Sequence, residues 1–425
     1  MSPKRKLKQR FYLIFARYFR FFANFSLKRW NPRIIAVTGS AGKTTMLNML
    51  EFELGSEAHY SHDANSAFGI AFDLLGLRGI TGSKLKWLFL VFAAPVRALY
   101  FSHKEPYYIV EIDGERPKET KFLASWLKPE MTLWISFGLS HAIQFEEEVR
   151  TGKFPTLEAA IADEFAELPR HTSSLVFIDA DSEPMKKYTS SLPTKAKVIK
   201  IDKSAMKKYL VYPTRTEFAT LDTVFRFPNP EPRDLAVQLL MLKELMKYLS
   251  RPLKTDFSAM SFPPGRSTFL EGKKGIKIID SSYNAHLISM ESILDMARSL
   301  HAAHKWLVIG DVVEQGSIEG AEHTRLADLI ARVNPEEVIL VGSRTKKYTA
   351  PRLKELGLSP KTTVDPKKAL EYLETHLTGS ETVIFKGSQY LEWLIEKLLK
   401  NPEDAGKLCR REPAAKKRRE KKGLY

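Results

Sequence analysis

Cysteine is nearly absent from this sequence, because its 425 residues contain a single one, Cys409. One thiol cannot form a disulfide framework within the chain, and it cannot supply the several ligands of a cysteine metal centre. Both classes of cross-linked domain are therefore excluded. So little cysteine in so long a chain is typical of a reducing compartment, and we expect the protein in the cytoplasm.

Long apolar runs are missing as well. A membrane-spanning helix needs roughly 18 to 20 uninterrupted apolar residues, and the nearest candidate, residues 87–101, is interrupted by Pro95 and Arg97. The aromatic segment after the basic start contains Arg17 and Arg20, and it lacks the small-residue cleavage site of a secretory signal. We therefore expect neither a membrane span nor export.

Acidic residues are missing from the start of the chain. Residues 1–30 contain nine Lys/Arg and no Asp/Glu, and residues 401–425 contain nine Lys/Arg and four Asp/Glu. The formal net charge is +16, so about +2 is left for the 370 residues between these two segments. A nearly neutral body lacks the broad basic surface of a nucleic-acid-binding domain, and we expect no nucleic-acid partner.

The basic first segment, residues 1–33, has the periodicity of an amphipathic helix. Its aromatic residues recur at intervals of four and three, whereas charged and polar residues fall on the opposite side. Two interpretations stay open: a helix in the plane of a membrane surface, with its cations beside anionic lipid, or a helix docked on the protein's own domain. The aromatic stripe consists of Phe11, Phe15, Tyr18, Phe22 and Phe25, and the opposite side of Lys6, Arg10, Arg17, Asn24 and Lys28.

From residue 34 onward, short apolar runs alternate with segments of helical periodicity, which is typical of a mostly parallel sheet covered on both faces. The segment FPPGRS at 262–267 interrupts the alternation, because Pro-Pro-Gly cannot continue a helix or a strand. We predict an α/β chain with a central domain over 34–258, a smaller C-terminal domain over 259–400 and a disordered basic tail over 401–425. The predicted strands are 34–38, 107–112, 132–137, 174–179 and 197–201 in the first domain and 276–280, 306–311, 337–342 and 382–387 in the second; predicted helices include 156–168 and 233–249.

The segment IIAVTGSAGKTT, residues 34–45, has the composition of a phosphate-binding loop. A strand is followed by small residues, a lysine and two threonines, and a helical segment comes next. Glycines let backbone N–H groups converge on phosphate oxygens, the lysine reaches the β/γ-phosphates, and the first threonine can hold Mg²⁺. A glycine-rich turn without a ligand is the alternative. The predicted nucleotide site consists of Gly39, Ser40, Ala41, Gly42, Lys43, Thr44 and Thr45.

This loop is shorter than the general P-loop pattern, since two residues rather than four separate the first glycine from the Gly-Lys pair. Gly-x-x-Gly-Lys-Thr-Thr after a strand resembles the Mur ligase family, the ATP-dependent enzymes that join amino acids or peptides to a carboxylate. Three later segments extend the resemblance over roughly residues 34 to 400, and they are similar to the branch that adds D-alanyl-D-alanine to a UDP-muramoyl tripeptide. They are IIDSSYNAHLISMESIL at 278–294, VIGDVVEQGSIEGAEH at 308–323 and FKGSQ at 385–389.

The resemblance implies a P-loop-type central domain, a Rossmann-like C-terminal domain and roles for single residues. Glu111 and His141 match the family's Mg²⁺-binding glutamate and histidine, and Thr44 would be a further ligand of an ion that prefers oxygen. Asn65 and Gly69 match the loop near the γ-phosphate and the carboxylate substrate. Arg266, Asp280 and Asn284 match positions that reach ATP from the second domain, and Lys386 matches a contact to the carboxylate of the incoming peptide.

The implied reaction has two steps, in which ATP first converts a carboxylate into an acyl phosphate and an amine then displaces the phosphate. Two anions meet in the first step, so Lys43, the helix start and Mg²⁺ would supply a positive field. The implied partners are a carboxylate-bearing cell-wall precursor and an amino acid or dipeptide. Two alternatives stay open: a Mur-like ligase for another polymer or a membrane-borne acceptor, and a membrane-associated ATP-binding protein that does not ligate.

Three departures from the family pattern stand out. The segment before the loop is a basic helix rather than the domain that holds the UDP end of the substrate. Phe165 stands where the family has a carbamylated lysine that helps to hold a second Mg²⁺, and the adjacent Glu164 is the candidate to replace it. The apolar stretch 83–101 belongs either to a membrane-facing patch with the first helix or to core packing.

Overall fold

The structure of the chain is a computed structural model that describes residues 3–62, 64–78, 84–283, 285–388 and 390–425; for 3–11 and 84–85 it describes the backbone alone. Asn284, one of the predicted nucleotide-binding residues, lies outside the described residues. The chain divides into two compact units. Unit 1 contains Met1–Lys203 and Val237–Leu253, and unit 2 contains Ser204–Ala236 and Lys254–Tyr425.

Unit 1 is built on a six-stranded sheet in the order β2-β3-β1-β4-β5-β6, in which every pair of neighbours is parallel. All five strands predicted in this part of the sequence are present, and the sheet adds a short strand at its edge. The strands are β1 Arg33–Thr38, β2 Ala58–Tyr60, β3 Tyr107–Ile112, β4 Met131–Trp134, β5 Leu175–Asp179 and β6 Lys197–Ile201. The predicted mostly parallel sheet is thus confirmed.

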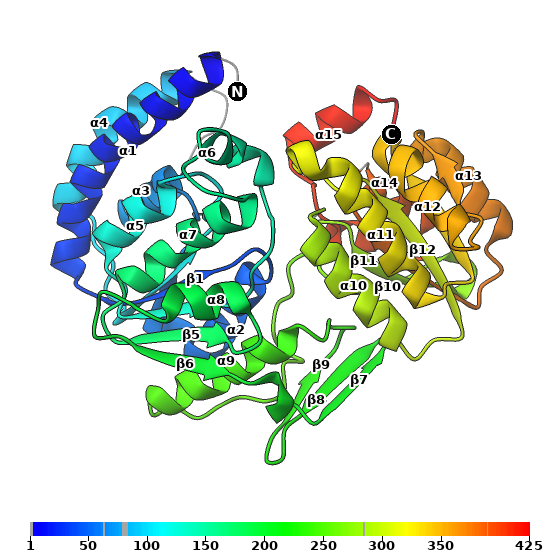
Figure 1. Cartoon of the computed structure of the whole chain (residues 1–425), viewed down its shortest axis with the longest axis horizontal. Coiled ribbons are helices and arrows are strands. Elements are labelled where there is room, and N and C mark those ends of the chain that lie inside the picture. Colours follow the sequence, from blue (N-terminus) through cyan, green and yellow to red (C-terminus); the bar gives the residue numbers. More distant parts are fainter. Residues whose placement is uncertain (1–2, 63, 79–83, 284, 389) are drawn as a thin grey trace. The chain divides into compact units, whose positions relative to one another are not determined.

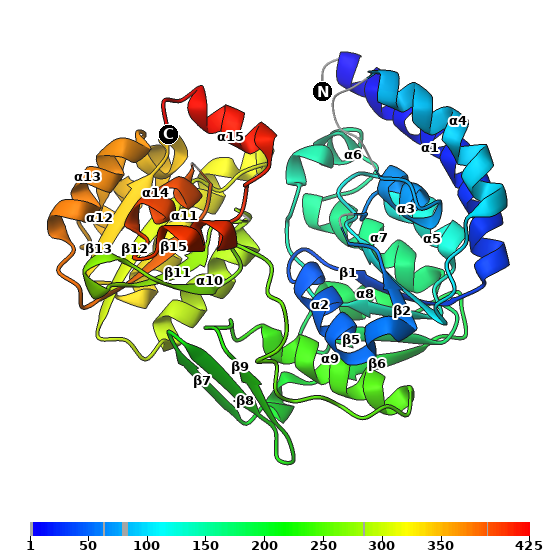
Figure 2. The ribbon, with the colours of Figure 1, turned by 180° about the vertical axis from the view of Figure 1, so that it is seen from behind.

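Helices cover this sheet on both sides (Figures 1 and 2), which a parallel sheet requires because each crossover places a helix on one face. The helices that follow β1 in this unit are α2 Lys43–Leu54, α3 Ala67–Leu74, α4 Lys84–Tyr100, α5 Glu119–Leu127, α6 Glu146–Arg150, α7 Leu157–Arg170, α8 Glu183–Thr189 and α9 Leu235–Tyr248. The two helices predicted at 156–168 and 233–249 correspond to α7 and α9.

The first helix, α1 Pro3–Trp30, forms an outer layer of unit 1 together with α4, and the two helices lie side by side (Figures 1 and 2). Ala16, Phe19 and Ala23 are fully buried in one apolar cluster with residues of α3 and α4. The sequence left two interpretations of this helix open, and the one in which the helix docks on the protein's own domain is confirmed.

The predicted division of α1 into an aromatic and a polar side is wrong in detail. Phe15 is exposed, whereas Tyr18 and Phe22 of the same stripe are half-buried. On the predicted polar side, Asn24 accepts a hydrogen bond from the indole of Trp126 at 3.2 Å. A helix enclosed by α3, α4 and α5 has three contact directions rather than one, and a two-sided pattern cannot represent that.

Unit 2 contains a six-stranded sheet in the order β10-β11-β15-β12-β13-β14, which is parallel except for the antiparallel pair β10–β11. The four predicted strands of this region are present. The strands are β10 Thr268–Glu271, β11 Lys277–Ser281, β12 His304–Gly310, β13 Glu337–Val341, β14 Lys361–Thr363 and β15 Glu381–Lys386; the helices are α10 Leu287–Ser299, α11 Glu319–Val333, α12 Ala350–Glu355, α13 Pro366–His376 and α14 Leu391–Leu398. Two apolar clusters fill the sheet's two faces.

A small antiparallel sheet also belongs to unit 2, and the sequence analysis missed it. It consists of β7 Lys208–Tyr212, β8 Arg215–Ala219 and β9 Val224–Phe227. Val211 is fully buried in the same cluster as Ile279 of β11. The contacts therefore divide the chain differently from the predicted boundary between 258 and 259. Packing between distant segments determines which unit a segment belongs to, and a Pro-Pro-Gly segment in the sequence does not indicate this packing.

The predicted disorder of the tail, residues 401–425, is contradicted. The structure places a helix, α15, at Pro413–Glu420, and Leu408 and Leu424 complete an apolar cluster of unit 2. Arg411 and Arg419 both pair with Glu396 of α14, at 2.6 and 3.0 Å. A few apolar residues with complementary ion pairs thus order a segment whose composition alone is typical of disorder.

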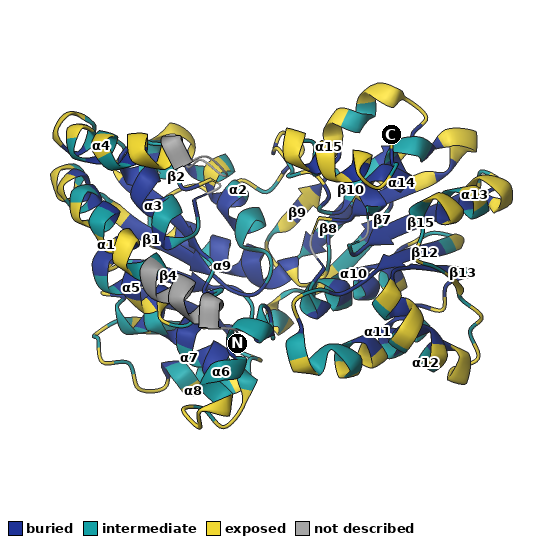
Figure 3. Ribbon diagram, turned by 90° about the horizontal axis from the view of Figure 1, so that it is seen from above, coloured by how far each residue is buried: buried dark blue, intermediate teal, exposed yellow. Residues whose placement is uncertain are grey.

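None of the helices in the described ranges has both the length and the apolar composition that a membrane crossing requires. Figure 3 shows, however, that exposed residues recur along α1 and α4.

Glu231, between β9 and α9, should make the stability of the fold depend on pH. Its side chain is buried, and burial raises its pKa to about 8. The folded chain then retains a proton that the unfolded chain releases at about pH 4.3, so the stabilisation is complete at low pH and is lost as pH rises toward 8. We expect wild type to lose on the order of 3 kcal/mol more than Glu231→Gln between pH 5 and 9 in urea unfolding. The exposed Glu374→Gln is the matched control, and equal losses in all three proteins would contradict the prediction.

Candidate active site

The loop between β1 and α2 is shaped for close backbone approach. Gly42 immediately precedes α2 with φ of 82°, and Gly39 has φ of 146°, both in the left-handed region that favours glycine. A Cβ on Gly42 would lie 2.4 Å from Nε2 of Gln238, and one on Gly39 would lie 2.9 Å from the backbone of Ser136. Both positions therefore require glycine, and the N–H groups at the start of α2 stay accessible to an anion.

The segment after β4 braces this loop from the side. The Ser136 hydroxyl accepts a hydrogen bond from the backbone N–H of Ala41 and donates one to its carbonyl, both at 2.8 Å. The Ser40 hydroxyl donates to the carbonyl of Gly138 at 2.8 Å and accepts from its N–H at 2.9 Å. These reciprocal bonds hold the loop rigid, so its N–H groups are preorganised.

Lys43 lies at the centre of a cluster of carboxylates. Its Nζ is 2.9 Å from Oδ1 of Asp113 and donates to the carbonyl of Gly39 at 2.7 Å. Burial by itself lowers the pKa of Lys43, but Asp113 and Glu111 outweigh it and raise the pKa, so the amine is charged. A half-buried cation held at the tip of a glycine loop, at the start of a helix, is the arrangement that receives a nucleotide's phosphates.

Two oxygen ligands for a divalent ion lie beside the lysine. The Thr44 hydroxyl donates to Oε2 of Glu111 at 3.1 Å, and the Glu111 backbone N–H is held by the Ser61 hydroxyl at 2.9 Å. A hydroxyl and a carboxylate in contact fit Mg²⁺, which prefers hard oxygen ligands and completes its shell with phosphate and water. His141 is placed by a different contact, because its Nε2 lies 3.4 Å from Oε1 of Glu115.

A cavity of about 300 Å³ opens next to these carboxylates. Asn65, predicted to be near the carboxylate substrate, lines it, and its carbonyl accepts a hydrogen bond from the Asp113 N–H at 3.4 Å. Gly69 lies in the first turn of α3, where its N–H donates to the Ser66 hydroxyl at 3.3 Å. The α1 helix contributes to the cavity wall through Tyr12, whose hydroxyl donates to Glu119 at 2.6 Å.

The predicted residues of unit 2 gather at the ends of β11 and β15. Asp280 and Lys386 are buried, and the two strands pair directly. Burial raises the pKa of Asp280, whereas burial and then the Arg266 guanidinium lower the pKa of Lys386 to about 7. The Arg266 guanidinium itself lies 4.7 Å from the centroid of the Tyr283 ring.

The comparisons with known proteins agree on one family. The family model of the Mur ligase glutamate ligase domain matches residues 265–389. The UDP-N-acetylmuramoyl-tripeptide–D-alanyl-D-alanine ligase of Buchnera aphidicola is 22% identical over 391 residues, which cover 87% of this chain and 76% of the relative. The ligase of the same name from Escherichia coli is 19% identical over 328 residues, 74% of this chain and 65% of the relative.

Among solved structures, the fold is similar to the MurF ligase of Thermotoga maritima in complex with ADP, with a TM-score of 0.70, 18% identity and coverage of 92% of this chain and 84% of that one. MurF from Acinetobacter baumannii gives a TM-score of 0.69 at 18% identity, covering 90% and 80%. The chain is similar to the Mur ligases in its C-terminal sequence and in its fold. The resemblance that began at the short glycine loop is therefore confirmed, as are the fold class and the enzyme class.

The structure resolves one of the departures from the family pattern. Phe165 is buried beside Trp134 with ring centroids 6.0 Å apart, so it is a core residue. The neighbouring Glu164 does not replace a metal-holding lysine, because its two carboxylate oxygens accept hydrogen bonds from the N–H groups of Lys118 and Thr120, each at 2.6 Å. Glu164 thus caps the start of α5, and burial raises its pKa to about 7.

Four residues of this candidate site were not predicted from the sequence: Asp113, Glu115, Ser136 and Gln238. Asp113 lies two residues after Glu111, which was a signal in the sequence, since side chains beyond the end of a central strand face the site. Ser136 lies 95 residues after Ala41 in the chain and reaches the loop through the sheet order. Gln238 lies later still and reaches the loop from α9. No local pattern marks them.

Proposed function

We propose that this Mur-type ligase uses ATP to activate the carboxylate of a peptidoglycan precursor as an acyl phosphate and then joins it to the amine of an amino acid or dipeptide. The single observation that carries the proposal is the charged Lys43, held by Asp113 and the Gly39 carbonyl at the tip of a rigid glycine loop. The names of the curated relatives support D-alanyl-D-alanine as the first amine to test.

In the first step the residues of the loop hold the nucleotide. The backbone N–H groups at the start of α2 bind phosphate oxygens, and Lys43 offsets the negative charge that accumulates as a carboxylate approaches the γ-phosphoryl group. We propose Thr44, Glu111 and His141 as the ligands of Mg²⁺, which when bound supplies further charge neutralisation. No side chain of the protein forms a covalent bond in this reaction, so positioning and electrostatics are its contribution.

We propose that the acceptor's carboxylate reaches the γ-phosphate through the cavity lined by Asn65. The cavity adjoins Asp113, the partner of Lys43, and it contains one cationic side chain, Arg116, whose guanidinium lies 4.7 Å from the Tyr12 ring centroid. Because Tyr12 belongs to α1, the first helix takes part in acceptor recognition.

We propose that the unit 2 residues serve the other reactants. Arg266, Asp280 and Asn284 would bind the nucleotide, and Lys386 the carboxylate of the incoming amine. Oδ2 of Asp280 is buried and has no hydrogen-bond partner among the described residues, so a ligand donor would satisfy it. With a pKa near 7, Lys386 gains its full charge when an anion binds beside it.

A peripheral membrane contact at the inner face of the plasma membrane is the second part of this proposal. On α1, Ile14, Phe21 and Phe25 are exposed at helical spacing, with the exposed cations Arg17 and Lys28 beside them. This combination of apolar side chains and cations in residues 1–30 suits the interface of an anionic bilayer.

The α4 helix extends the same face, so that core packing explains only its inner side. Leu90, Ala94 and Ala98 are buried, but the opposite side of the helix is apolar too, and Phe92 and Leu99 are 69% and 70% exposed. A helix that is apolar all round is ordinarily buried on every side. The outer face of α4 consists of Leu88, Phe89, Phe92, Val96, Leu99 and Tyr100.

Charge favours lipid over a second copy of the chain as the occupant of this face. Residues 1–30 and 74–104 together contain fourteen Lys/Arg and no Asp/Glu. Two such surfaces in contact would bring like charges together, whereas anionic headgroups would neutralise them, each cation contributing about 1 kcal/mol near the surface. We therefore propose anionic phospholipid as the partner of α1 and α4.

Phosphate release tests the ligase itself. The full chain, ATP and Mg²⁺ are combined with UDP-muramoyl tripeptide, and phosphate is measured with and without D-alanyl-D-alanine. We expect release that requires both acceptor and amine, and a new amide detected by mass spectrometry. If phosphate release requires the acceptor and a different amine, the ligase activity stands and only the proposed amine changes. ATP hydrolysis that no acceptor or amine stimulates would contradict ligation.

A further inference from the structure

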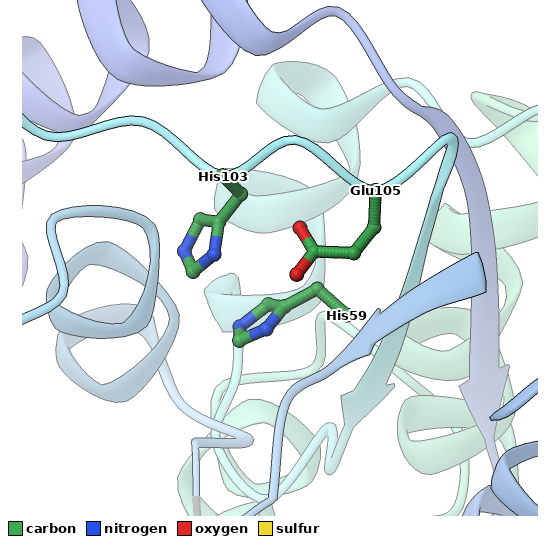
Figure 4. A group of neighbouring side chains, drawn as sticks. All are labelled: His59, His103 and Glu105. Carbon is green, nitrogen blue, oxygen red and sulfur yellow. The ribbon is translucent and has the colours of Figure 1, made fainter. Parts of the chain in front are cut away.

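Two histidines and a glutamate meet in unit 1 at the edge of the sheet away from the glycine loop. His59 lies in β2, and His103 and Glu105 lie in the segment that leads into β3, whereas the loop with Lys43 follows the carboxyl end of β1. The candidate ligand atoms of the three side chains all lie within 4.8 Å of one another. In Figure 4 the Glu105 carboxylate points toward the two imidazole rings.

Asp73, at the end of α3, orients both imidazoles. Nε2 of His59 lies 3.0 Å from its carboxylate Oδ1, and Nε2 of His103 lies 3.1 Å from its backbone carbonyl. Both acceptors require a hydrogen on Nε2, which leaves the Nδ1 lone pair of each neutral ring available. Metal-binding histidines show this pattern, with the second ring nitrogen donating to a carboxylate or carbonyl. The Tyr108 hydroxyl fixes Asp73 in turn, donating to Oδ2 at 2.8 Å.

The backbone N–H of Lys104 holds the Glu105 carboxylate, at 2.9 Å from Oε2. Two imidazoles and one carboxylate thus face a common space.

We propose that His59, His103 and Glu105 bind one divalent transition-metal ion, for which Zn²⁺ is the best match, and that the ion fastens β2 to the segment before β3. Two histidines and a carboxylate with an open fourth position are a zinc ligand set, and imidazole ligands disfavour Mg²⁺ and Ca²⁺. The centroids of the two imidazole rings lie 3.8 Å apart, and the ring planes meet at 30°.

The position of this centre indicates a structural role. The indole N–H of Trp30, the last residue of α1, donates to the Glu105 carbonyl at 2.7 Å, and its ring lies 4.7 Å from that of His103. The ion would therefore secure the end of the first helix against the sheet. It would stabilise the folded chain by mass action, since the unfolded chain does not bring the three ligands together.

Co²⁺ and Zn²⁺ titrations of the full, tag-free chain without nucleotide test the centre. We expect one equivalent of Co²⁺ to bind with the visible absorption of a four-coordinate site, Zn²⁺ to displace it, and Zn²⁺ to raise the melting temperature. His103→Asn and Glu105→Gln should each weaken Co²⁺ binding by at least about tenfold. His62→Asn is the matched control, because His62 forms an exposed pair with Glu51 at 2.8 Å, and it should bind as wild type does.

Two results would overturn the proposal. One is a wild-type chain that binds no Co²⁺ or Zn²⁺; the other is His103→Asn and Glu105→Gln chains that bind like wild type. His141→Asn separates this centre from the nucleotide site, since it should keep the Co²⁺ spectrum. If His103→Asn fails to fold, as judged by circular dichroism, Glu105→Gln decides the outcome, because this substitution keeps the shape of the side chain.

Discussion

The Lys43→Ala variant turns over ATP at least about a thousandfold more slowly than wild type, with acceptor and amine present. The Lys43 ammonium is the positive charge that the loop places where the carboxylate and the γ-phosphate meet, and no other cation is within hydrogen-bond distance of Gly39 among the described residues. Without it, two anions approach each other beside Asp113 and Glu111. Steady-state phosphate release and the formation of amide product measure the effect.

A matched variant separates the loss of this particular cation from the loss of a positive charge elsewhere in the unit. Lys121→Ala removes an exposed lysine from the same unit and should keep wild-type turnover. Circular dichroism should show Lys43→Ala folded, because the loop keeps its bonds to Ser136 and Gly138. A folded Lys43→Ala variant with normal turnover would mean that the glycine loop does not bind the reacting phosphate.

Replacing three side chains on the outer face of α4 by serine should release the protein from anionic vesicles. In Phe89→Ser/Phe92→Ser/Leu99→Ser, three large apolar groups are removed, each worth about 1.5 to 3 kcal/mol when fully buried. We expect at least a hundredfold weaker binding to vesicles that contain phosphatidylglycerol, measured by sedimentation. Because all three side chains are exposed, the melting temperature should not fall.

Two controls make this result specific. Leu221, Leu356 and Val364 are exposed apolar residues of unit 2, and their triple serine variant should bind vesicles as wild type does. Wild type should bind weakly to zwitterionic vesicles, and its binding should fall as salt is added. Wild type that ignores the vesicles, or a triple α4 variant that binds equally well, would refute the membrane contact. Concentration-dependent self-association of wild type without vesicles would point to a second copy instead.

Substitution is a better test of this contact than deletion of residues 1–30. Ala16, Phe19 and Ala23 of α1 are fully buried against the rest of unit 1. Removing the helix would expose the apolar residues of α3 beneath it and destabilise the unit, so loss of vesicle binding by a truncated chain would have two causes.

Features that depend on a short stretch of chain were predictable from the sequence. The strands that were predicted are apolar runs of four to seven residues, and their type follows from side-chain period and length. The glycine loop was readable because left-handed backbone angles at Gly39 and Gly42 are required by the turn itself. The three-residue strand β2 was not predicted, because so short a run shows no periodicity.

Features that depend on distant segments were not predictable in the same way. Glu164 was the candidate to replace a missing metal ligand. Its carboxylate instead caps α5 by accepting a hydrogen bond from the N–H of Thr120, 44 residues earlier in the chain. The charged tail was predicted to be disordered, yet Leu408 and Leu424 fill an apolar cluster. Composition describes a segment in isolation, and these outcomes depended on the surface that the rest of the unit offered.

The sequence by itself determined that this chain has parallel α/β sheets and a phosphate-binding loop, because apolar periodicity and glycine's backbone freedom act within a few residues. Tertiary structure decided which side chains share a site. It pairs Asp113 with Lys43, it places the Ser136 hydroxyl against the glycine loop, and it brings Asp73 into hydrogen-bond contact with His59 and His103. The reason is physical. Hydrogen bonds and ion pairs form between groups a few ångströms apart, and only the order and register of the strands bring residues so far apart in the chain to that distance.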